Sequence, residues 1–294
     1  MKQFLLSSPP GIEGSQRFVR LSGKDYHYLV RVRRLESGGE FNALLPDGEP
    51  VRVRVCSTAG GVLLGECLPA SVSAPGADLP PLVLFQALPK GAKMDLIIRQ
   101  ATEGGITGIV GFESARSERR PAGGAAGRLE RWRRIVKEAR QQSGSPIATE
   151  LRPPCRFGEM LAYWEELRKS RERPVGLLLH PAEDIQRDLE ACRTGEFLLH
   201  TGQAGISEGA PLAKGSFHGY LEGNPDCVVI AIGPEGGFSP EEAIQFVHGG
   251  FKPVSLGNTV LRTETAALYA AAAIRIILLE SESWIHKPQG RLIR

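Results

Sequence analysis

The spacing of hydrophobic and polar residues changes partway along the chain. Before about residue 70, apolar and polar residues alternate in short runs, with the two-residue period of β-strands. The run from Val51 to Val55 alternates strictly, so its two arginines would lie on the face opposite its valines. Short strands of this kind predict a small β-barrel or β-sandwich. We expect these strands at residues 17–21, 41–45, 51–55 and 62–64.

Residues 71–81 show neither a strand period nor a helical one and are rich in proline, which is typical of a linker. The chain length of 294 residues is also consistent with two domains. We therefore expect an N-terminal β-rich domain at residues 1–70 and a second domain at residues 82–285.

After the linker, apolar runs typical of buried strands alternate with segments of helical period. In residues 93–103, for example, Met94, Ile97, Ile98 and Ala101 fall on one helical face. This alternation predicts an α/β fold with a mostly parallel sheet covered by helices. The expected strands are 82–86, 106–112, 176–180, 197–200, 227–232 and 253–256, and the further helices lie around Trp132, at 239–248 and at 264–280.

The composition, with 41% hydrophobic and 23% charged residues, is ordinary for a soluble globular protein. The most apolar segment, residues 265–279, is too short for a membrane span, and the N-terminal segment lacks the apolar core of a signal peptide. The five cysteines form no Cys-x-x-Cys pair, which favours reduced thiols over a zinc site. We expect a cytoplasmic protein without a metal ion.

The sequence Gly-Pro-Glu-Gly-Gly at positions 233–237 directly follows the apolar run 227–232. Ser239, Pro240 and Glu242 then form a helix start, with an N-cap, a proline in the first turn and a capping-box glutamate. A glycine-rich turn would therefore lie at the carboxyl end of a buried strand, where open α/β sheets bind ligands. A tight turn without a ligand would have the same pattern.

A second glycine-containing loop follows the short strand 253–256 and leads into the last helix. It includes Gly257, and Arg262 and Glu264 stand at the start of the helix. Free backbone N–H groups there suit a polar or anionic ligand, although Thr263 could simply cap the helix. Two such loops after two strands of one sheet predict a single compact pocket.

Common signatures of other enzymes are absent: the dinucleotide Gly-x-Gly-x-x-Gly, the phosphate-binding Walker A sequence and the zinc-binding His-Glu-x-x-His. Ser207 lies in a Gly-x-Ser-x-Gly sequence, but no strand directly precedes it and no apolar helix follows it. A serine hydrolase is therefore a minor alternative.

Positive charge is concentrated between residues 116 and 140, a segment that contains nine Lys and Arg residues but only three Glu residues. Clustered arginine favours a phosphate-rich partner such as nucleic acid. The alternative is that these side chains only form the solvent-exposed face of a helix.

These motifs together resemble the ribosomal RNA small-subunit methyltransferase E (RsmE) family of the knotted SPOUT superfamily. The resemblance rests on Gly-Pro-Glu-Gly-Gly at 233–237 and Leu-Gly-x-x-x-Leu-Arg-Thr-Glu-Thr at 256–265. It extends to residues 86–98, 101–103, 112–117, 131–139 and 142–144, and to the N-terminal segment 27–34.

The resemblance implies a SPOUT-type parallel sheet with a C-terminal trefoil knot, a PUA-like N-terminal domain and a homodimer. It also implies S-adenosyl-L-methionine as the methyl donor and N3 of a uridine in 16S rRNA of the assembled 30S subunit as the target. A non-catalytic RNA-binding relative remains an alternative.

The family's knot loops hold the cofactor largely through backbone atoms, and the positions that match them form the expected cofactor site. Uracil N3 carries a proton at neutral pH, so we expect Arg262 to stabilise the uridine anion or bind a phosphate, and Glu264 to be a weaker candidate for the base. The expected cofactor-binding residues are Leu199, His200, Gly233, Pro234, Glu235, Gly236, Gly237, Leu256, Gly257, Leu261 and Thr263.

In such proteins the N-terminal domain is expected to help bind RNA. The candidate RNA-binding residues are Arg17, Arg20, Arg31, Arg33 and Arg34, together with Arg131, Arg133 and Arg134 on the basic helix.

The chain departs from the family pattern at a few places. Asn258-Thr259 stand where Pro-Arg is usual, and Gly104 replaces a usual leucine. Two runs, 177–180 and 198–200, compete as the strand that supplies the cofactor site. We favour the second because it is closer in sequence to Gly233.

Overall fold

The structure of the protein is a computed structural model that describes residues 4–69, 79–117, 125–180, 184, 217–257 and 259–284. The chain forms two compact units: Met1–Ala77 with Val136–Ala148, and Asp78–Ile135 with Thr149–Arg294. Most of the predicted linker, 71–81, lies outside the described residues, so its bounds stay a prediction.

The first unit contains a six-stranded sheet of order β1-β4-β5-β6-β3-β2, in which the only parallel pair is β1 with β4. All four predicted strand runs lie in it. Its short helical turns are α1 (Gly23–Tyr26), η1 (His27–Val32) and η2 (Ala59–Gly61). The strands are β1 (Phe4–Leu5), β2 (Gly11–Glu13), β3 (Gln16–Ser22), β4 (Glu40–Leu44), β5 (Pro50–Ser57) and β6 (Val62–Pro69).

Strand β5 confirms the alternation read from the sequence. Its three valines are buried in the core of the unit, whereas Arg52 and Arg54 lie on the other face and form ion pairs with Glu40 of β4. The period of two thus separates a core face from a polar face, as expected for a sheet with one solvated side.

The second unit is an α/β fold whose six strands pair only in parallel, in the order β12-β10-β11-β7-β8-β9. The strands are β7 (Leu82–Ala87), β8 (Gly108–Glu113), β9 (Glu150–Arg156), β10 (Pro174–Leu179), β11 (Cys227–Ile232) and β12 (Lys252–Val254). The helices are α2 (Lys93–Glu103), α4 (Phe157–Lys169), α6 (Phe217–Leu221), α7 (Pro240–His248) and α8 (Thr263–Trp284), together with α3 (Ala125–Ser143) up to Ile135; from Val136 on, α3 belongs to the first unit.

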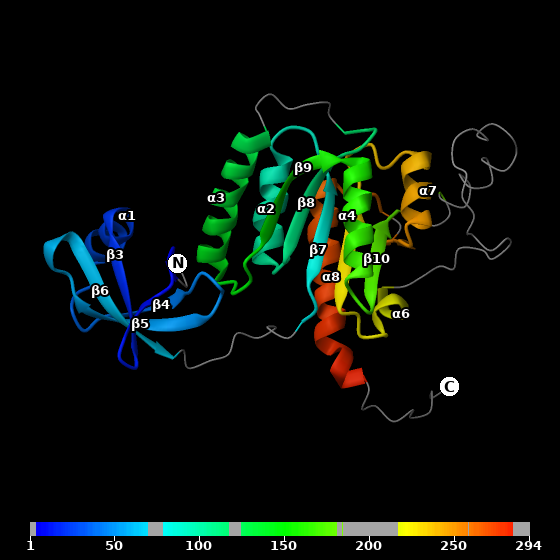
Figure 1. Cartoon of the computed structure of the whole chain (residues 1–294). Helices are drawn as coiled ribbons and strands as arrows, with labels where there is room; N and C mark the ends of the chain where they lie inside the picture. The colour runs from blue at the N-terminus through cyan, green and yellow to red at the C-terminus, as the bar shows by residue number, and fades with distance from the viewer. Residues whose placement is uncertain are drawn as a thin grey trace, which may run out of the picture. The chain divides into compact units, whose positions relative to one another are not determined.

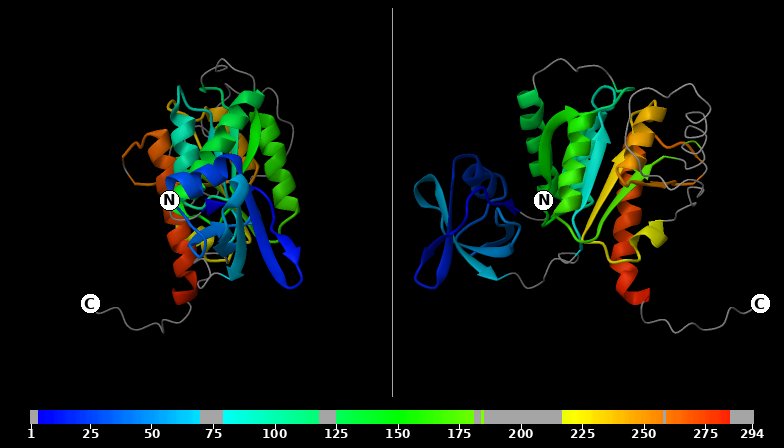
Figure 2. Two further views of the ribbon diagram at one scale, coloured as in Figure 1. Left: turned by 90° about the vertical axis from the view of Figure 1, so that its left-hand side faces the viewer. Right: turned by 45° about the vertical axis from the view of Figure 1, so that its right-hand side comes forward.

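Helices lie on both faces of this sheet, and α4 and α8 are on opposite faces (Figures 1 and 2). On one face, Trp164 of α4 and Phe246 of α7 pack against Phe85 and Phe112 of the sheet. On the other face, α8 contacts β7, β11 and α2. Every residue of β7 and β11 is buried, which explains why these central strands read as continuous apolar runs.

The start of α7 confirms the predicted helix signal. Ser239 is the N-cap, Pro240 lies in the first turn, and the side chains of Ser239 and Glu242 each accept a hydrogen bond from the other's backbone N–H. This cap fixes the point at which the chain leaves the glycine-rich turn and enters the helix.

The preference for residues 198–200 as the strand beside the glycine loops needs correction. Residues Leu177 to Leu179 of β10 pair with β11 on one side and β12 on the other, so that place in the sheet is filled. The run 197–200 lies outside the described residues. Proximity in sequence was a poor guide because parallel strands are joined by long crossovers.

The sequence reading also missed β9 and α4. Strand β9 lies at the edge of the sheet and contains Pro153 and Pro154, which weakened its strand pattern.

Candidate functional site at the carboxyl edge of the sheet

The two predicted glycine loops lie at the same edge of the parallel sheet. Loop 233–239 follows β11, and loop 255–262 follows β12, with β10 between these strands. The loop from β7 to α2, residues 88–92, starts at the same edge. Because parallel strands all end at one edge, the fold brings these three connections together where α/β sheets bind ligands.

The turn at 233–237 is tight. The N–H of Gly237 donates to the carbonyl oxygen of Pro234 at 2.9 Å, and Gly237 has φ of +68°, a left-handed conformation. At Gly233, an added Cβ would lie 3.3 Å from backbone atoms of Gly237 and Phe238. The left-handed φ therefore favours glycine at 237, and a Cβ at 233 would fit only if the neighbouring backbone shifted by a few tenths of an ångström.

Gly236 lies under a different constraint. Its carbonyl oxygen accepts a hydrogen bond from Arg116 at 2.8 Å, and an added Cβ would meet only the side chain of Arg116, at 3.4 Å. Arg116 comes from the loop after β8, so it places a guanidinium group beside the glycine loop.

The second loop is held by a hydrogen bond from a side chain to its backbone. The hydroxyl of Ser255 donates to the carbonyl oxygen of Gly257 at 3.0 Å, and Gly257 has φ of +104°. Among the described residues, and apart from its chain neighbours, no atom lies within 4 Å of a Cβ added at Gly257. Leu256 and Leu261 on either side are half-buried.

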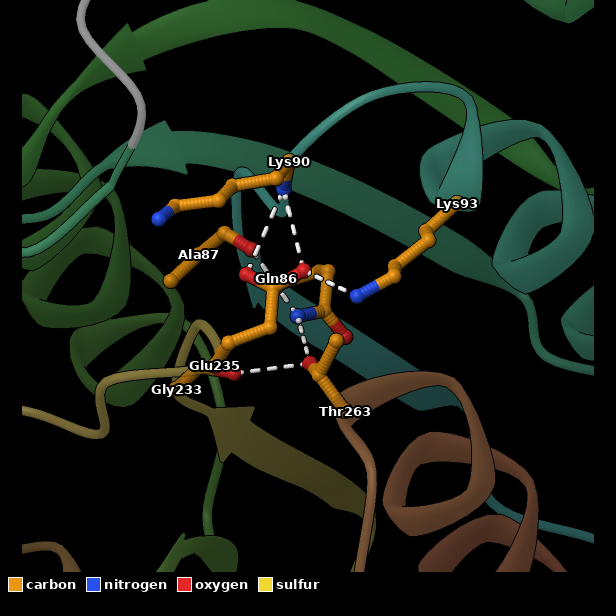
Figure 3. A network of polar contacts seen from close by, with 7 residues as sticks. All are labelled: Gln86, Ala87, Lys90, Lys93, Gly233, Glu235 and Thr263. Atoms are coloured by element: carbon orange, nitrogen blue, oxygen red, sulfur yellow. Dashed lines mark hydrogen bonds and ion pairs between the residues drawn. The ribbon is translucent and has the colours of Figure 1, made fainter.

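A buried hydrogen-bond network joins the two loops to β7 (Figure 3). The hydroxyl of Thr263, at the start of α8, donates to the carbonyl oxygen of Gly233 at 2.7 Å. The same hydroxyl accepts from the side-chain amide of Gln86 at 3.0 Å. Thr263, which was predicted to bind the cofactor, thus lies in contact with the first residue of the glycine loop.

Glu235 is anchored to the loop that follows β7 (Figure 3). Its carboxylate accepts hydrogen bonds from the backbone N–H of Lys90 at 3.2 and 3.3 Å and from the ammonium group of Lys93 at 2.5 Å. Burial would raise the pKa of Glu235, but the bonds from Lys93 and from backbone N–H groups outweigh it and hold the pKa below its usual value. The carboxylate therefore positions the loop.

Arg262 and Glu264 flank Thr263 without pairing with each other. Arg262 is exposed, and Glu264 is half-buried with one carboxylate oxygen, Oε2, that is buried and has no hydrogen-bond partner among the described residues. A buried acceptor without a donor is costly, so a ligand that donates to this oxygen would be favoured.

Pro234 is buried within the turn. The predicted cofactor residues Leu199 and His200 lie outside the described residues, as do Asn258 and Ser207. Strand β10 ends between the two loops, at Leu179. The backbone N–H of the next residue, His180, donates to the carbonyl oxygen of Val254 at 3.2 Å.

The arginines predicted to bind RNA divide into two groups. Arg17 is bound by both carboxylate oxygens of Glu49, at 2.7 and 2.8 Å, and Arg131 forms an ion pair with Asp95. The other six are exposed, and the described part of the chain provides no acidic side chain that pairs with them: Arg20, Arg31, Arg33, Arg34, Arg133 and Arg134.

The sequence reading did not single out Gln86, Lys93 and Arg116 as parts of this site. All three lie in the motifs that carried the family resemblance, which was the one available signal. Their roles depend on partners more than 100 residues away in the chain, so no local pattern could reveal them.

Other kinds of site find no support in the described segments. They contain no cluster of His, Cys, Asp and Glu side chains that could hold a metal ion. None of their helices is long and apolar enough to cross a membrane. The four cysteines within them are all free thiols.

The chain is similar to known methyltransferases over most of its length. A family model described as an RNA methyltransferase domain matches residues 77–275. The ribosomal RNA small subunit methyltransferase E of Synechocystis is 32% identical over 261 residues, which cover 88% of this chain and 73% of that protein. The protein of the same name from Bacillus subtilis is 27% identical, with 86% of this chain and 88% of that protein covered.

A solved structure extends this similarity to the fold. The crystal structure of a ribosomal RNA small subunit methyltransferase E from Neisseria gonorrhoeae, bound to S-adenosyl methionine, matches with a TM-score of 0.66 at 25% identity. The match covers 94% of this chain and 98% of that one.

Proposed function

We infer that this chain, which belongs to the ribosomal RNA small subunit methyltransferase E family, is an S-adenosyl-L-methionine-dependent methyltransferase of 16S ribosomal RNA. We propose N3 of a uridine in the assembled 30S subunit as its target. The observation that carries this function is the pair of glycine loops that meet at the carboxyl edge of the sheet, joined through Thr263 and Gly233.

The residues at this edge fit S-adenosyl-L-methionine. No described residue other than the chain neighbours lies within 4 Å of a Cβ added at Gly237 or Gly257, which leaves the backbone of both loops accessible to a ligand. The unpartnered carboxylate oxygen of Glu264 offers an acceptor to a donor group. We propose that the backbone of residues 233–237 and 256–261 holds the cofactor, and that Leu179 and His180 take the place first given to Leu199 and His200.

When bound, the cofactor supplies an electrophilic methyl group on a sulfonium sulfur. Positioning is then the main task of the protein, because an in-line displacement depends on the alignment of the reacting atoms. The exposed guanidinium of Arg262 would stabilise negative charge on the uracil or bind a phosphate. Glu264 would accept the N3 proton if its partner-free oxygen faces the base.

The path of the chain supports the proposed SPOUT knot. Strand β12 pairs with β10 at the edge of the sheet, yet Thr263 contacts Gly233 after β11 and Gln86 of β7. Between residues 254 and 263 the chain must therefore pass the carboxyl end of β10. The mainly antiparallel sheet of the first unit similarly supports a PUA-like domain.

A homodimer fits the exposed face of α8. Tyr269, Ile276 and Leu279 are 59%, 52% and 53% exposed and follow one another at helical spacing. Neighbouring Leu268 is 38% exposed. An apolar stripe of this kind on a helix marks an interaction surface. We propose that a second copy of the chain covers it.

Nucleoside mass spectrometry of 16S rRNA tests the function. Small subunits that lack the modification would be incubated with the protein and S-adenosyl-L-methionine, with Arg168→Ala as the control variant, because Arg168 is exposed on α4 and, among the described residues, pairs only with neighbouring Glu165. We expect one N3-methyluridine per 16S rRNA, and about 100-fold slower transfer by Arg262→Ala with unchanged cofactor affinity. Cofactor binding without any methylated uridine would point instead to a non-catalytic relative.

A further inference from the structure

Gln86 is the most deeply buried polar side chain of the site, with no exposed surface. Its amide nitrogen lies 2.9 Å from the carbonyl oxygen of Ala87, 3.0 Å from the hydroxyl of Thr263 and 3.4 Å from the carbonyl oxygen of Ile232. Carbonyl oxygens cannot donate, so chemistry requires the nitrogen rather than the oxygen of the amide to face them.

The orientation of the Gln86 amide also determines the acceptor to which the hydroxyl of Thr263 donates its proton. Its hydroxyl accepts from Gln86, so its single proton goes to the carbonyl oxygen of Gly233, at 2.7 Å. Because that proton is used within the protein, the hydroxyl cannot donate to a ligand. That Thr263 binds the cofactor stays a prediction, but the proton of its hydroxyl is already used within the protein.

The bonds connect three segments that are remote in sequence: the end of β7, the first residue after β11 and the first residue of α8. Gly233 begins one glycine loop, and Thr263 directly follows the other. Their separation is therefore set by one short hydrogen bond, and the amide of Gln86 donates a second bond to the same hydroxyl (Figure 3).

We propose that Gln86 and Thr263 form a buried positioning clamp that holds the two glycine loops at the spacing that cofactor binding and methyl transfer require. The clamp rests on the proposed function, because its effect is exerted on that site. Neither side chain needs to touch the cofactor: both act through the backbone of the loops.

Variants that keep shape but remove hydrogen bonds test the clamp. Thr263→Val removes the hydroxyl, Thr263→Ser retains it, and Gln86→Met removes the donor at similar volume. The matched control is Thr149→Val, since Thr149 is equally buried and its hydroxyl donates to the carbonyl oxygen of Ile106 at 2.7 Å, at the opposite edge of the sheet.

The readouts are the dissociation constant for S-adenosyl-L-homocysteine by calorimetry and the urea midpoint of the ligand-free protein. We expect Thr263→Val and Gln86→Met each to weaken binding roughly tenfold, and Thr263→Ser to bind within about twofold of wild type. The double variant Gln86→Met with Thr263→Val should bind S-adenosyl-L-homocysteine about as well as the weaker-binding of the two single variants, because the two residues act as a unit. Thr149→Val should lose stability but keep its affinity.

Wild-type affinity in folded Thr263→Val and Gln86→Met would overturn the clamp while leaving the function intact. Additive losses in the double variant would overturn it as well. A wild-type protein that binds no S-adenosyl-L-homocysteine would instead contradict the proposed function. If Thr263→Val does not fold, the dissociation constants of Gln86→Met and Thr263→Ser for S-adenosyl-L-homocysteine decide whether the clamp holds the loops.

Discussion

At the scale of residues, the three glycines within 233–237 meet different constraints. Gly237 has a left-handed φ, and a Cβ at Gly233 would lie 3.3 Å from the backbone of Gly237 and Phe238. Gly236 meets only the flexible side chain of Arg116, so the fold tolerates a Cβ there. Of the three, Gly236 is therefore the position at which an added side chain should disturb the fold least.

Glu235 predicts a dependence of stability on pH. Its pKa is lower in the folded protein than the usual value of 4.5, so its contribution is complete above that pH and is lost as the pH falls through the lowered pKa. We expect Glu235→Gln to reduce the free energy of unfolding by about 0.5 kcal/mol at pH 7, since solvent screens its partly exposed pair with Lys93. The difference from wild type should shrink below about pH 4.5, as measured by urea unfolding across pH.

Glu165 provides the control for this prediction. It also forms an ion pair, with Arg168, but on the exposed surface of α4, where such pairs contribute little. Glu165→Gln should therefore unfold like wild type at pH 7. Equal losses of unfolding free energy in Glu235→Gln and Glu165→Gln would mean that the hydrogen bonds of Glu235 stabilise the fold no more than an exposed ion pair does.

At the scale of elements, α3 carries exposed positive charge that nothing in the described structure neutralises at Arg133 and Arg134. If these residues contact phosphates, changing both to alanine should reduce the slope of log affinity against log salt concentration by about 1.5 to 2. Filter binding of small subunits over a range of salt concentrations measures this slope.

The matched control removes two positive charges from another helix. Arg168 and Lys169 of α4 both pair with Glu165, so their replacement by alanine should leave the salt slope unchanged. An unchanged slope for the α3 double variant would show that its arginines are only solvated.

At the scale of the whole molecule, the apolar stripe of α8 predicts self-association. Tyr269→Glu with Ile276→Glu would place two charges in a surface that a second copy should bury, and such burial is costly. We expect wild type to sediment as a dimer and this variant as a monomer. Ile12→Glu is the control, because Ile12 is 74% exposed in the first unit. A dimeric α8 double variant would exclude this face as the interface.

The sequence alone determined the class of the fold and most of its elements. Helix α2 spans the residues predicted from its apolar spacing and ends at the predicted glycine, Gly104. The N-cap of α7 is Ser239, also as predicted. These features are local: helical period, strand alternation and capping depend on residues a few positions apart. The two glycine loops could be found for the same reason.

Only the tertiary structure decided which segments meet. It placed β10 between the two loops, paired Arg17 and Arg131 with carboxylates, and tied Glu235 to Lys93. It also showed that the hydroxyl of Thr263 serves the protein itself, through Gln86 and Gly233. Such contacts join residues far apart in sequence, and their selection depends on the packing of the whole sheet, which no local pattern of residues records.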